Sequence, residues 1–242
     1  MAIAGIAKSV QLILRGDLRP VNYGMLLPPL YPIIDFTCFA TKPDPIMAIV
    51  RYAEELITAG ATLIQLRDKS VAESPRRFLT CAPELRRLTL GITKPRATLI
   101  INDRVDICLA SGADGVHLGQ DDLSPAAARR IFNQVIDGRN LLIGFSTHNL
   151  AQLRVADAFP IDYIAIGPVF ATGSKANPDP VIGIEGVKQA RQATRKPLVA
   201  IGGITRLNCR EVKDAGADSV AVISDLLESP AKAVADFLRV LG

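Results

Sequence analysis

Apolar residues recur along this chain in short unbroken runs, and each run ends abruptly in polar residues. Val, Ile and Leu dominate these runs. Strands of an all-parallel sheet are buried on both faces, so they read as continuous apolar runs instead of alternating ones. We therefore predict eight parallel strands: Leu30–Phe36, Thr62–Leu66, Ala97–Ile101, Gly115–Leu118, Leu141–Phe145, Tyr163–Ile166, Leu198–Ile201 and Ser219–Ile223.

Segments with helical periodicity separate these runs, and several begin at a capping residue followed by proline. Asp44-Pro45, Ser74-Pro75, Ser124-Pro125 and Ser229-Pro230 have this form, which is typical of a helix N-terminus. Eight strands that are each followed by a helix predict an α/β fold, a single-domain (β/α)8 TIM barrel, with an open doubly wound sheet as the alternative. We assign residues 25–242 to the barrel. Residues 1–24 have no clear period and are predicted to form a dispensable N-terminal extension.

A weak internal repeat supports the closed barrel. Gly60-Ala-Thr62, Gly112-Ala-Asp114 and Gly216-Ala-Asp218 each precede a predicted strand, and the glycines are 52 and 104 residues apart. Asp162 falls near the missing position. A step of 52 residues equals two strand–helix units, although glycine also ends helices in unrelated folds.

Composition excludes several classes of protein. The 242 residues are 49% hydrophobic and 21% charged, with a net charge of +4 and no Trp. The basic residues are scattered without interleaved aromatic residues, which argues against a nucleic-acid groove. No apolar run is long enough to span a membrane, and Lys8, Gln11 and Arg15 interrupt any signal peptide. The four cysteines are widely spaced without a CxxC pair, so we expect reduced thiols and a cytoplasmic location.

In a barrel of this type, the active site lies at the C-terminal ends of the strands. After the second strand, Gln65, Arg67 and Lys69 alternate, so their side chains are predicted to face inward. Arg and Lys placed in this way suit a polyphosphate. A solvated turn beyond the strand is the alternative.

The next two strands end in Asn102-Asp103 and in His117 with Gln120-Asp-Asp122. Asp103 and Asp122 beside Arg67 and Lys69 suggest Mg²⁺, which binds one or two carboxylates together with substrate phosphate oxygens. Alternatively, either aspartate caps the following helix, or Asp103 pairs with Arg104 or Arg67. Zinc lacks ligands at the required spacing, and His117 is interpreted as a hydrogen-bond donor.

The remaining strand ends predict a second anionic site. Ser146 binds phosphate or belongs to the next helix cap, and residues 167–180 form a long loop with Thr172, Gly173, Ser174 and Lys175, a lid candidate. Gly202-Gly203 and Ile223-Ser224 follow the last two strands, where barrels commonly bind phosphate; these glycines could also belong to simple turns. Two anionic sites at one mouth indicate a reaction that joins two phosphorylated molecules.

Taken together, seven motifs resemble those of the thiamine phosphate synthase family over the chain from about Leu30 to its end. They are Gln65-Leu-Arg-Asp-Lys69, Ile101-Asn-Asp-Arg104, Val116-His-Leu-Gly-Gln-Asp-Asp122, Gly144-Phe-Ser-Thr-His148, Gly167-Pro-Val-Phe170 with Thr172-Gly-Ser-Lys175, Ile201-Gly-Gly-Ile-Thr205 and Val222-Ile-Ser224. The resemblance implies a cytoplasmic transferase of thiamine biosynthesis. Such enzymes join 4-amino-2-methyl-5-(diphosphooxymethyl)pyrimidine to a thiazole phosphate and release pyrophosphate.

The same resemblance assigns roles to individual residues. It implies that Asp103 and Asp122 hold Mg²⁺ and that Arg67, Lys69, Ser146 and Lys175 are catalytic. The implied contacts with the pyrimidine diphosphate are Gln65, Arg67, Lys69, Asn102, Ser146 and Lys175, and those with the thiazole phosphate are Thr172, Ser174, Gly203, Ile223 and Ser224. Leu66, Asp68 and Gly173 are implied substrate contacts without a particular substrate. Ser174 stands where the family often has Thr, which keeps the hydroxyl.

Two alternatives to the synthase remain open on sequence. A thiazole tautomerase-like isomerase shares Ile101-Asn-Asp-Arg104 and His148, but it has no evident use for a second metal carboxylate. A barrel that only binds a phosphorylated ligand has no need of intact Arg67, Lys69 and both aspartates. No partner other than the small-molecule substrates is expected, and the sequence does not predict the oligomeric state.

Overall fold

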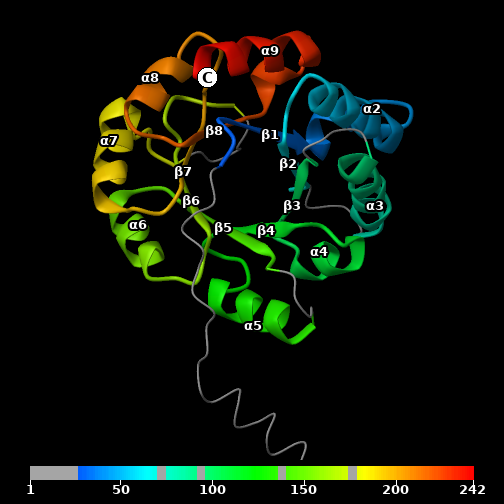
Figure 1. Ribbon diagram of the computed structural model, residues 1–242, viewed down its shortest axis with the longest axis horizontal. Coiled ribbons are helices and arrows are strands. Elements are labelled where there is room, and N and C mark those ends of the chain that lie inside the picture. The colour runs from blue at the N-terminus through cyan, green and yellow to red at the C-terminus, as the bar shows by residue number, and fades with distance from the viewer. Residues whose placement is uncertain (1–26, 70–74, 92–95, 136–139, 174–178) are drawn as a thin grey trace, which may run out of the picture.

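The computed structural model describes residues 27–69, 75–91, 96–135, 140–173 and 179–242. Eight parallel strands close into a barrel in which β1 pairs with both β2 and β8 (Figure 1). This closure confirms the predicted (β/α)8 barrel and excludes the open doubly wound sheet. The strands are β1 (Leu30–Asp35), β2 (Leu63–Arg67), β3 (Thr98–Asn102), β4 (Gly115–Leu118), β5 (Leu142–Thr147), β6 (Tyr163–Ile166), β7 (Leu198–Ile201) and β8 (Ser219–Val222).

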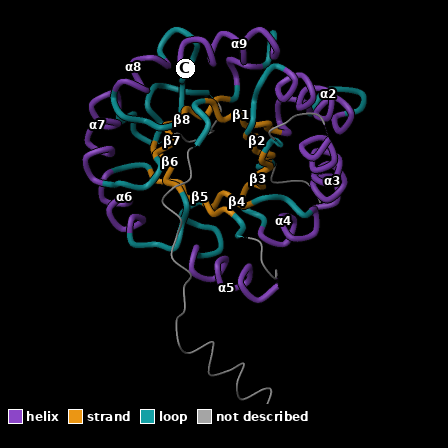
Figure 2. The backbone as a smooth tube through the Cα atoms, viewed as in Figure 1, coloured by secondary structure: helices purple, strands orange, loops and turns teal. Residues whose placement is uncertain are grey.

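Helices form an outer ring around the strands, as Figure 2 shows. They are α2 (Pro45–Thr58), α3 (Pro75–Gly91), α4 (Val105–Ser111), α5 (Pro125–Val135), α6 (Leu150–Asp157), α7 (Gly183–Ala193), α8 (Cys209–Asp214) and α9 (Pro230–Leu241), with short 3₁₀ helices η1 (Phe36–Phe39) and η2 (Ser224–Leu226). The predicted extension, residues 1–24, lies outside the described residues.

The strand boundaries differ from prediction by one or two residues. Phe36 was predicted to end the first strand but begins η1, where the Asp35 carboxylate accepts a hydrogen bond from Thr37 N. The fifth strand was predicted to end at Phe145 and instead continues to Thr147. This continuation follows from its pairing with β6, which hydrogen-bonds polar residues that an apolar pattern does not reveal.

The structure confirms two of the four predicted caps, and Ser74 lies outside the described residues. The Asp44 side chain accepts a hydrogen bond from Met47 N at 3.0 Å, and Ser124 Oγ accepts one from Ala127 N at 3.3 Å. At α9, however, the Ser229 side chain makes no capping bond, although the helix begins at Pro230 as predicted.

The internal repeat has a physical basis at the N-terminal end of the barrel. One aspartate directly precedes each of β4, β6 and β8. In each case its Oδ2 atom accepts a hydrogen bond from a backbone N–H at the first or second residue of the neighbouring strand, β3, β5 or β7 respectively. Each of these aspartates also pairs with an arginine of a helix, at 2.6 to 2.8 Å: Asp114 with Arg86, Asp162 with Arg129, and Asp218 with Arg191. The barrel therefore repeats in units of two strands and two helices. Thr62 occupies the corresponding position before β2.

Apolar side chains fill two regions. One cluster lies between the strands and the surrounding helices, and a smaller one fills the barrel interior with Tyr31, Ile33, Ile100, Tyr163 and Val199 among its members. All four cysteines are free thiols within the described ranges. No helix in the described part of the chain combines the length and apolarity needed to cross a membrane.

Candidate active site

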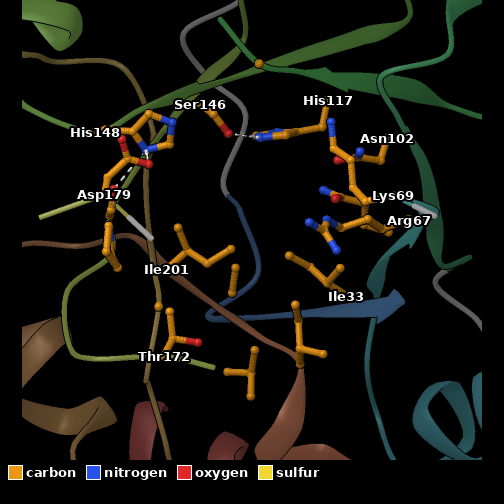
Figure 3. A pocket seen from close by; sticks show the side chains of 18 of the residues that line it. Ile33, Arg67, Lys69, Asn102, His117, Ser146, His148, Thr172, Asp179 and Ile201 are labelled. Carbon is orange, nitrogen blue, oxygen red and sulfur yellow. Dashed lines mark hydrogen bonds and ion pairs between the residues drawn. The ribbon is translucent and has the colours of Figure 1, made fainter. Parts of the chain in front are cut away.

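A cavity of about 500 Å³ opens at the C-terminal ends of the strands. Residues from all eight strand ends or the loops that follow them contribute to its wall, as expected for a barrel enzyme. Figure 3 shows Arg67, Lys69 and Asn102 on one side of the cavity and Thr172 with Ile201 on the other. The cavity therefore has a cationic side and a less polar side.

The cationic side is built on β2. Gln65, Arg67 and Lys69 all line the cavity, as their alternation predicted. The Arg67 guanidinium donates to the carboxylate of Asp35, a buried residue at the end of β1. Lys69 Nζ lies 2.6 Å from Asp103 Oδ2. Two acidic neighbours thus hold both cationic side chains at the cavity wall.

Two carboxylates, Asp103 and Asp122, face each other across the ends of β3 and β4. Burial first, and then the neighbouring Asp122, raise the pKa of Asp103 to about 6, although Lys69 acts in the opposite direction. Asp103 also has a φ of 62°, a left-handed conformation that few side chains adopt. The protein therefore holds two acidic groups together against their mutual repulsion.

The helix-capping role does not match the geometry of these two aspartates, nor does a pair between Asp103 and Arg104, whereas the negative charge of Asp103 does act on Arg67 and opposes the lowering of its pKa by burial. Asp103 caps no helix, because the N-cap position of α4 is Arg104, which instead pairs with Asp106. Asp122 Oδ2 accepts a hydrogen bond from Gly119 N at 2.7 Å, so it is held within its own loop. Both side chains line the cavity.

Ser146 and Asn102 present polar atoms to the cavity from β5 and β3. Ser146 Oγ lies 2.8 Å from His117 Nε2, while the cap of α6 is Asn149, so Ser146 does not cap that helix. Burial lowers the pKa of His117 to about 4, which leaves the imidazole neutral at pH 7. Asn102 Nδ2 is buried and has no hydrogen-bond partner among the described residues. Because an unmet buried donor is costly, this amide is available to a ligand.

The loops after β6, β7 and β8 form the opposite wall. Thr172, Gly203, Ile223 and Ser224 line it. Gly203 has a φ of 63°, and a Cβ atom there would lie 2.5 Å from the Ala171 carbonyl oxygen. Glycine is therefore required for the backbone of this wall, and not only for a turn.

Some predicted site residues lie elsewhere. Leu66 is fully buried in the cluster between strands and helices, and the Asp68 carboxylate accepts two hydrogen bonds from Arg77 of α3. Neither these two side chains nor Gly173 line the cavity. Ser174 and Lys175 fall outside the described residues.

Sequence reasoning missed three features of the site. Asp35, which orients Arg67, was detectable as a carboxylate ending an apolar strand. Tyr31 and Tyr163 are buried polar residues inside predicted strands, and they join hydroxyl groups across the barrel at 2.8 Å. His148 Nδ1 lies 3.0 Å from the Gly167 carbonyl oxygen and 3.4 Å from Asp179 Oδ2 (Figure 3), a contact between distant loops that no local pattern indicates.

Comparison with known proteins agrees with this geometry. The model of the thiamine monophosphate synthase family matches residues 37–226. Thiamine-phosphate synthase of Koribacter versatilis is 50% identical over 218 residues, which cover 90% of this chain and 98% of that protein. The corresponding protein of Azorhizobium caulinodans is 43% identical over 75% of this chain and 81% of its own.

A solved structure extends the comparison to three dimensions. Thiamine phosphate pyrophosphorylase from Pyrococcus furiosus superposes with a TM-score of 0.73 at 34% identity, over 88% of this chain and 95% of that one. Sequence, fold and cavity therefore agree, and the chain belongs to the thiamine monophosphate synthase family.

Proposed function

We propose that this cavity joins 4-amino-2-methyl-5-(diphosphooxymethyl)pyrimidine to a thiazole phosphate, forming thiamine phosphate and pyrophosphate. The observation that carries the proposal is that one cavity has two unlike walls, each lined by groups that suit an anion. One wall offers Arg67 and Lys69 with two carboxylates, and the other offers hydroxyls and glycine backbone. Family membership supports the same activity, because the relatives are thiamine-phosphate synthases. These enzymes are transferases of thiamine biosynthesis.

The cationic wall would bind the diphosphate of the pyrimidine substrate. Arg67 provides a planar fork and Lys69 a point charge, a combination suited to neighbouring phosphates. Ser146 and Asn102 add uncharged polar contacts beside them. From the family resemblance, Lys175 would complete this group, and Gln65 would contact the pyrimidine.

Asp103 and Asp122 would hold Mg²⁺ between the protein and the diphosphate. The donor set fits the ion, because Mg²⁺ is commonly bound by one or two carboxylates together with substrate phosphates and water. The raised pKa of Asp103 beside Asp122 also fits, since a nearby cation would relieve this repulsion. When bound, the ion would supply positive charge to the departing pyrophosphate.

The opposite wall would bind the thiazole phosphate. Thr172 and Ser224 offer hydroxyls, while Gly203 and Ile223 bring backbone close to the cavity. Barrels commonly bind phosphate through the loops after the last two strands. Ser174 would add a further hydroxyl from the loop after β6.

The proposed reaction is a dissociative displacement. The bond between the methylene carbon and the diphosphate oxygen breaks, and its electron pair leaves with pyrophosphate. The aminopyrimidine stabilises the resulting methylene cation, while Arg67 and Lys69 stabilise the departing charge. The floor of the cavity is apolar, with Ile33, Ile201 and Ala221, and would shield the cation from water. The thiazole nitrogen then attacks the carbon; it carries no proton, so no general base is needed.

Two sets of variants test this assignment. Asp122→Ala should raise the Mg²⁺ concentration needed for coupling and lower turnover about a hundredfold or more, because charge stabilisation by a metal amounts to several kcal/mol. Within the β6 loop, Lys175→Ala should mainly lower kcat, and Ser174→Ala should mainly raise KM for the thiazole phosphate. Full activity of Asp122→Ala, or full activity in a chelator, would exclude the metal site. A tautomerase would keep its activity both after the Asp122→Ala substitution and in a chelator.

A further inference from the structure

A continuous chain of polar groups crosses the barrel interior and ends at the active-site serine. Gln65 Nε2 lies 2.9 Å from the Tyr31 hydroxyl, which lies 2.8 Å from the Tyr163 hydroxyl. The Tyr163 hydroxyl is 3.1 Å from His117 Nδ1, and His117 Nε2 is 2.8 Å from Ser146 Oγ. Both tyrosines are buried in the interior cluster and do not line the cavity.

The local packing shows that the chain is built into the barrel. The Tyr163 ring lies against Gly144 of the neighbouring strand, where a Cβ atom would approach the ring to 2.1 Å. The same ring stacks on His117 with centroids 5.5 Å apart and planes at 26°. Gly144 therefore makes room for the tyrosine, and the stacking fixes the imidazole orientation.

The direction of each hydrogen bond follows from the donors and acceptors available. The Gln65 amide N–H donates to Tyr31, whose own O–H must then go elsewhere. Among the described residues, the remaining partner of Tyr31 is the Tyr163 hydroxyl. Tyr163 then donates to His117 Nδ1, so that the ring proton lies on Nε2. His117 Nε2–H donates to Ser146 Oγ, and the serine proton is left free.

We propose that Tyr31 and Tyr163 are positioning residues that fix the Nε2–H tautomer of His117, and thereby make the Ser146 hydroxyl a hydrogen-bond donor toward the cavity. With the opposite polarity, Ser146 would donate to His117 and present only lone pairs to a ligand. A donor is the form that an anionic diphosphate requires. The tautomer part of the proposal is independent of the reaction; the kinetic part rests on the proposed function.

The tautomer can be measured directly because the chain has only two histidines, His117 and His148. Long-range ¹H–¹⁵N NMR of the imidazole rings at pH 7, with His148→Gln for assignment, should show a protonated Nε2 and an unprotonated Nδ1 for His117. In Tyr163→Phe, the Nδ1 atom loses its donor, and the His117 signals should shift toward a mixture of tautomers. A proton on Nδ1 in the wild-type protein would overturn the proposal.

A double-mutant cycle tests the functional consequence. Ser146→Ala should lower kcat about 10- to 100-fold, the effect expected on losing a hydrogen bond to a charged group. Tyr163→Phe should lower kcat in the same direction, with KM for the thiazole phosphate unchanged. Combined with Ser146→Ala, it should cause no further loss, because its effect acts through the serine.

Tyr52→Phe is the matched control, because the Tyr52 hydroxyl is also buried but has no hydrogen-bond partner in the described part of the chain. It should leave both kcat and the His117 signals unchanged. Independent, multiplicative losses in Tyr163→Phe/Ser146→Ala would contradict the proposal and indicate a merely structural role. The tautomer measured in the protein with an intact Tyr163 does not depend on this variant, so it decides the proposal even if Tyr163→Phe does not fold.

Discussion

The facing carboxylates Asp103 and Asp122 make a quantitative prediction for the metal-free protein. Burial and Asp122 raise the pKa of Asp103 to about 6 from its usual 3.8. This difference corresponds to about 3 kcal/mol of preference for the neutral form, since each pH unit is equivalent to about 1.4 kcal/mol. Burial is the largest cause and the neighbouring Asp122 adds to it, so the negative charge of Asp122 accounts for only part of this preference.

Asp122→Asn removes that charge while keeping the shape of the side chain. The asparagine carbonyl can still accept the hydrogen bond from Gly119 N. At pH 7.5 without metal, the free energy of unfolding should rise by a part of this preference, and each kcal/mol of that gain raises Tm by about 2–4 °C in a domain of this size. Because the pKa of Asp103 is raised in the folded state, ionised Asp103 destabilises the fold fully above about pH 6. This destabilisation disappears as the pH falls toward 3.8. The stabilisation should therefore be smaller at pH 5 than at pH 7.5.

Thermal unfolding in a chelator at both pH values measures this effect, and a titration with Mg²⁺ completes the test. Mg²⁺ should raise the Tm of the wild-type protein, because an ion that binds the folded state stabilises it. The rise should be much smaller for Asp122→Asn, which lacks one of the two carboxylates. Asp121→Asn is the matched control, since this exposed neighbour carries the same charge. A destabilised metal-free Asp122→Asn protein at pH 7.5, or an equal Mg²⁺ effect on both proteins, would refute the reasoning.

Two further predictions concern the framework of the barrel. Asp162→Ala leaves Arg129 buried without its carboxylate partner at 2.6 Å, so the free energy of unfolding measured in denaturant titrations should fall by about 3–5 kcal/mol. Loss of the exposed Asp214 is the control and should change the free energy of unfolding by less than about 1 kcal/mol. Equal effects would contradict a structural role for the buried pair. Gly203→Ala introduces a side chain at a φ of 63° and against a carbonyl oxygen, so Tm should fall and KM for the thiazole phosphate should rise. Gly91→Ala is the control: the added atom meets open space at the end of α3, so this change should not lower Tm and should leave KM unchanged.

The apolar pattern was sufficient to predict the barrel and the end at which its site lies. Parallel strands are buried on both faces, so each one leaves an apolar run and a polar tip in the sequence. Strict alternation also placed Gln65, Arg67 and Lys69 in the cavity. The family resemblance added Leu66 and Asp68, whose side chains instead face the helix layer. At these positions, the alternation of the strand was the better guide to side-chain direction.

Contacts that depend on closure of the barrel could not be predicted. Tyr31 and Tyr163 are 132 residues apart in sequence, and they meet only because β1 and β6 face each other across the interior. Likewise, Asp35 reaches Arg67 because the register of β1 and β2 places the two residues side by side. Local patterns predict which residues lie at a strand tip, whereas strand register determines which of them hold each other in place.

The central claim is that one cavity couples two phosphorylated substrates. The most direct test is to mix the purified protein with the pyrimidine diphosphate and the thiazole phosphate and to quantify both products with and without Mg²⁺. The account predicts thiamine phosphate and pyrophosphate in equal amounts, formed only when both substrates and Mg²⁺ are present. Pyrophosphate release without thiamine phosphate, or undiminished coupling in a chelator, would contradict it.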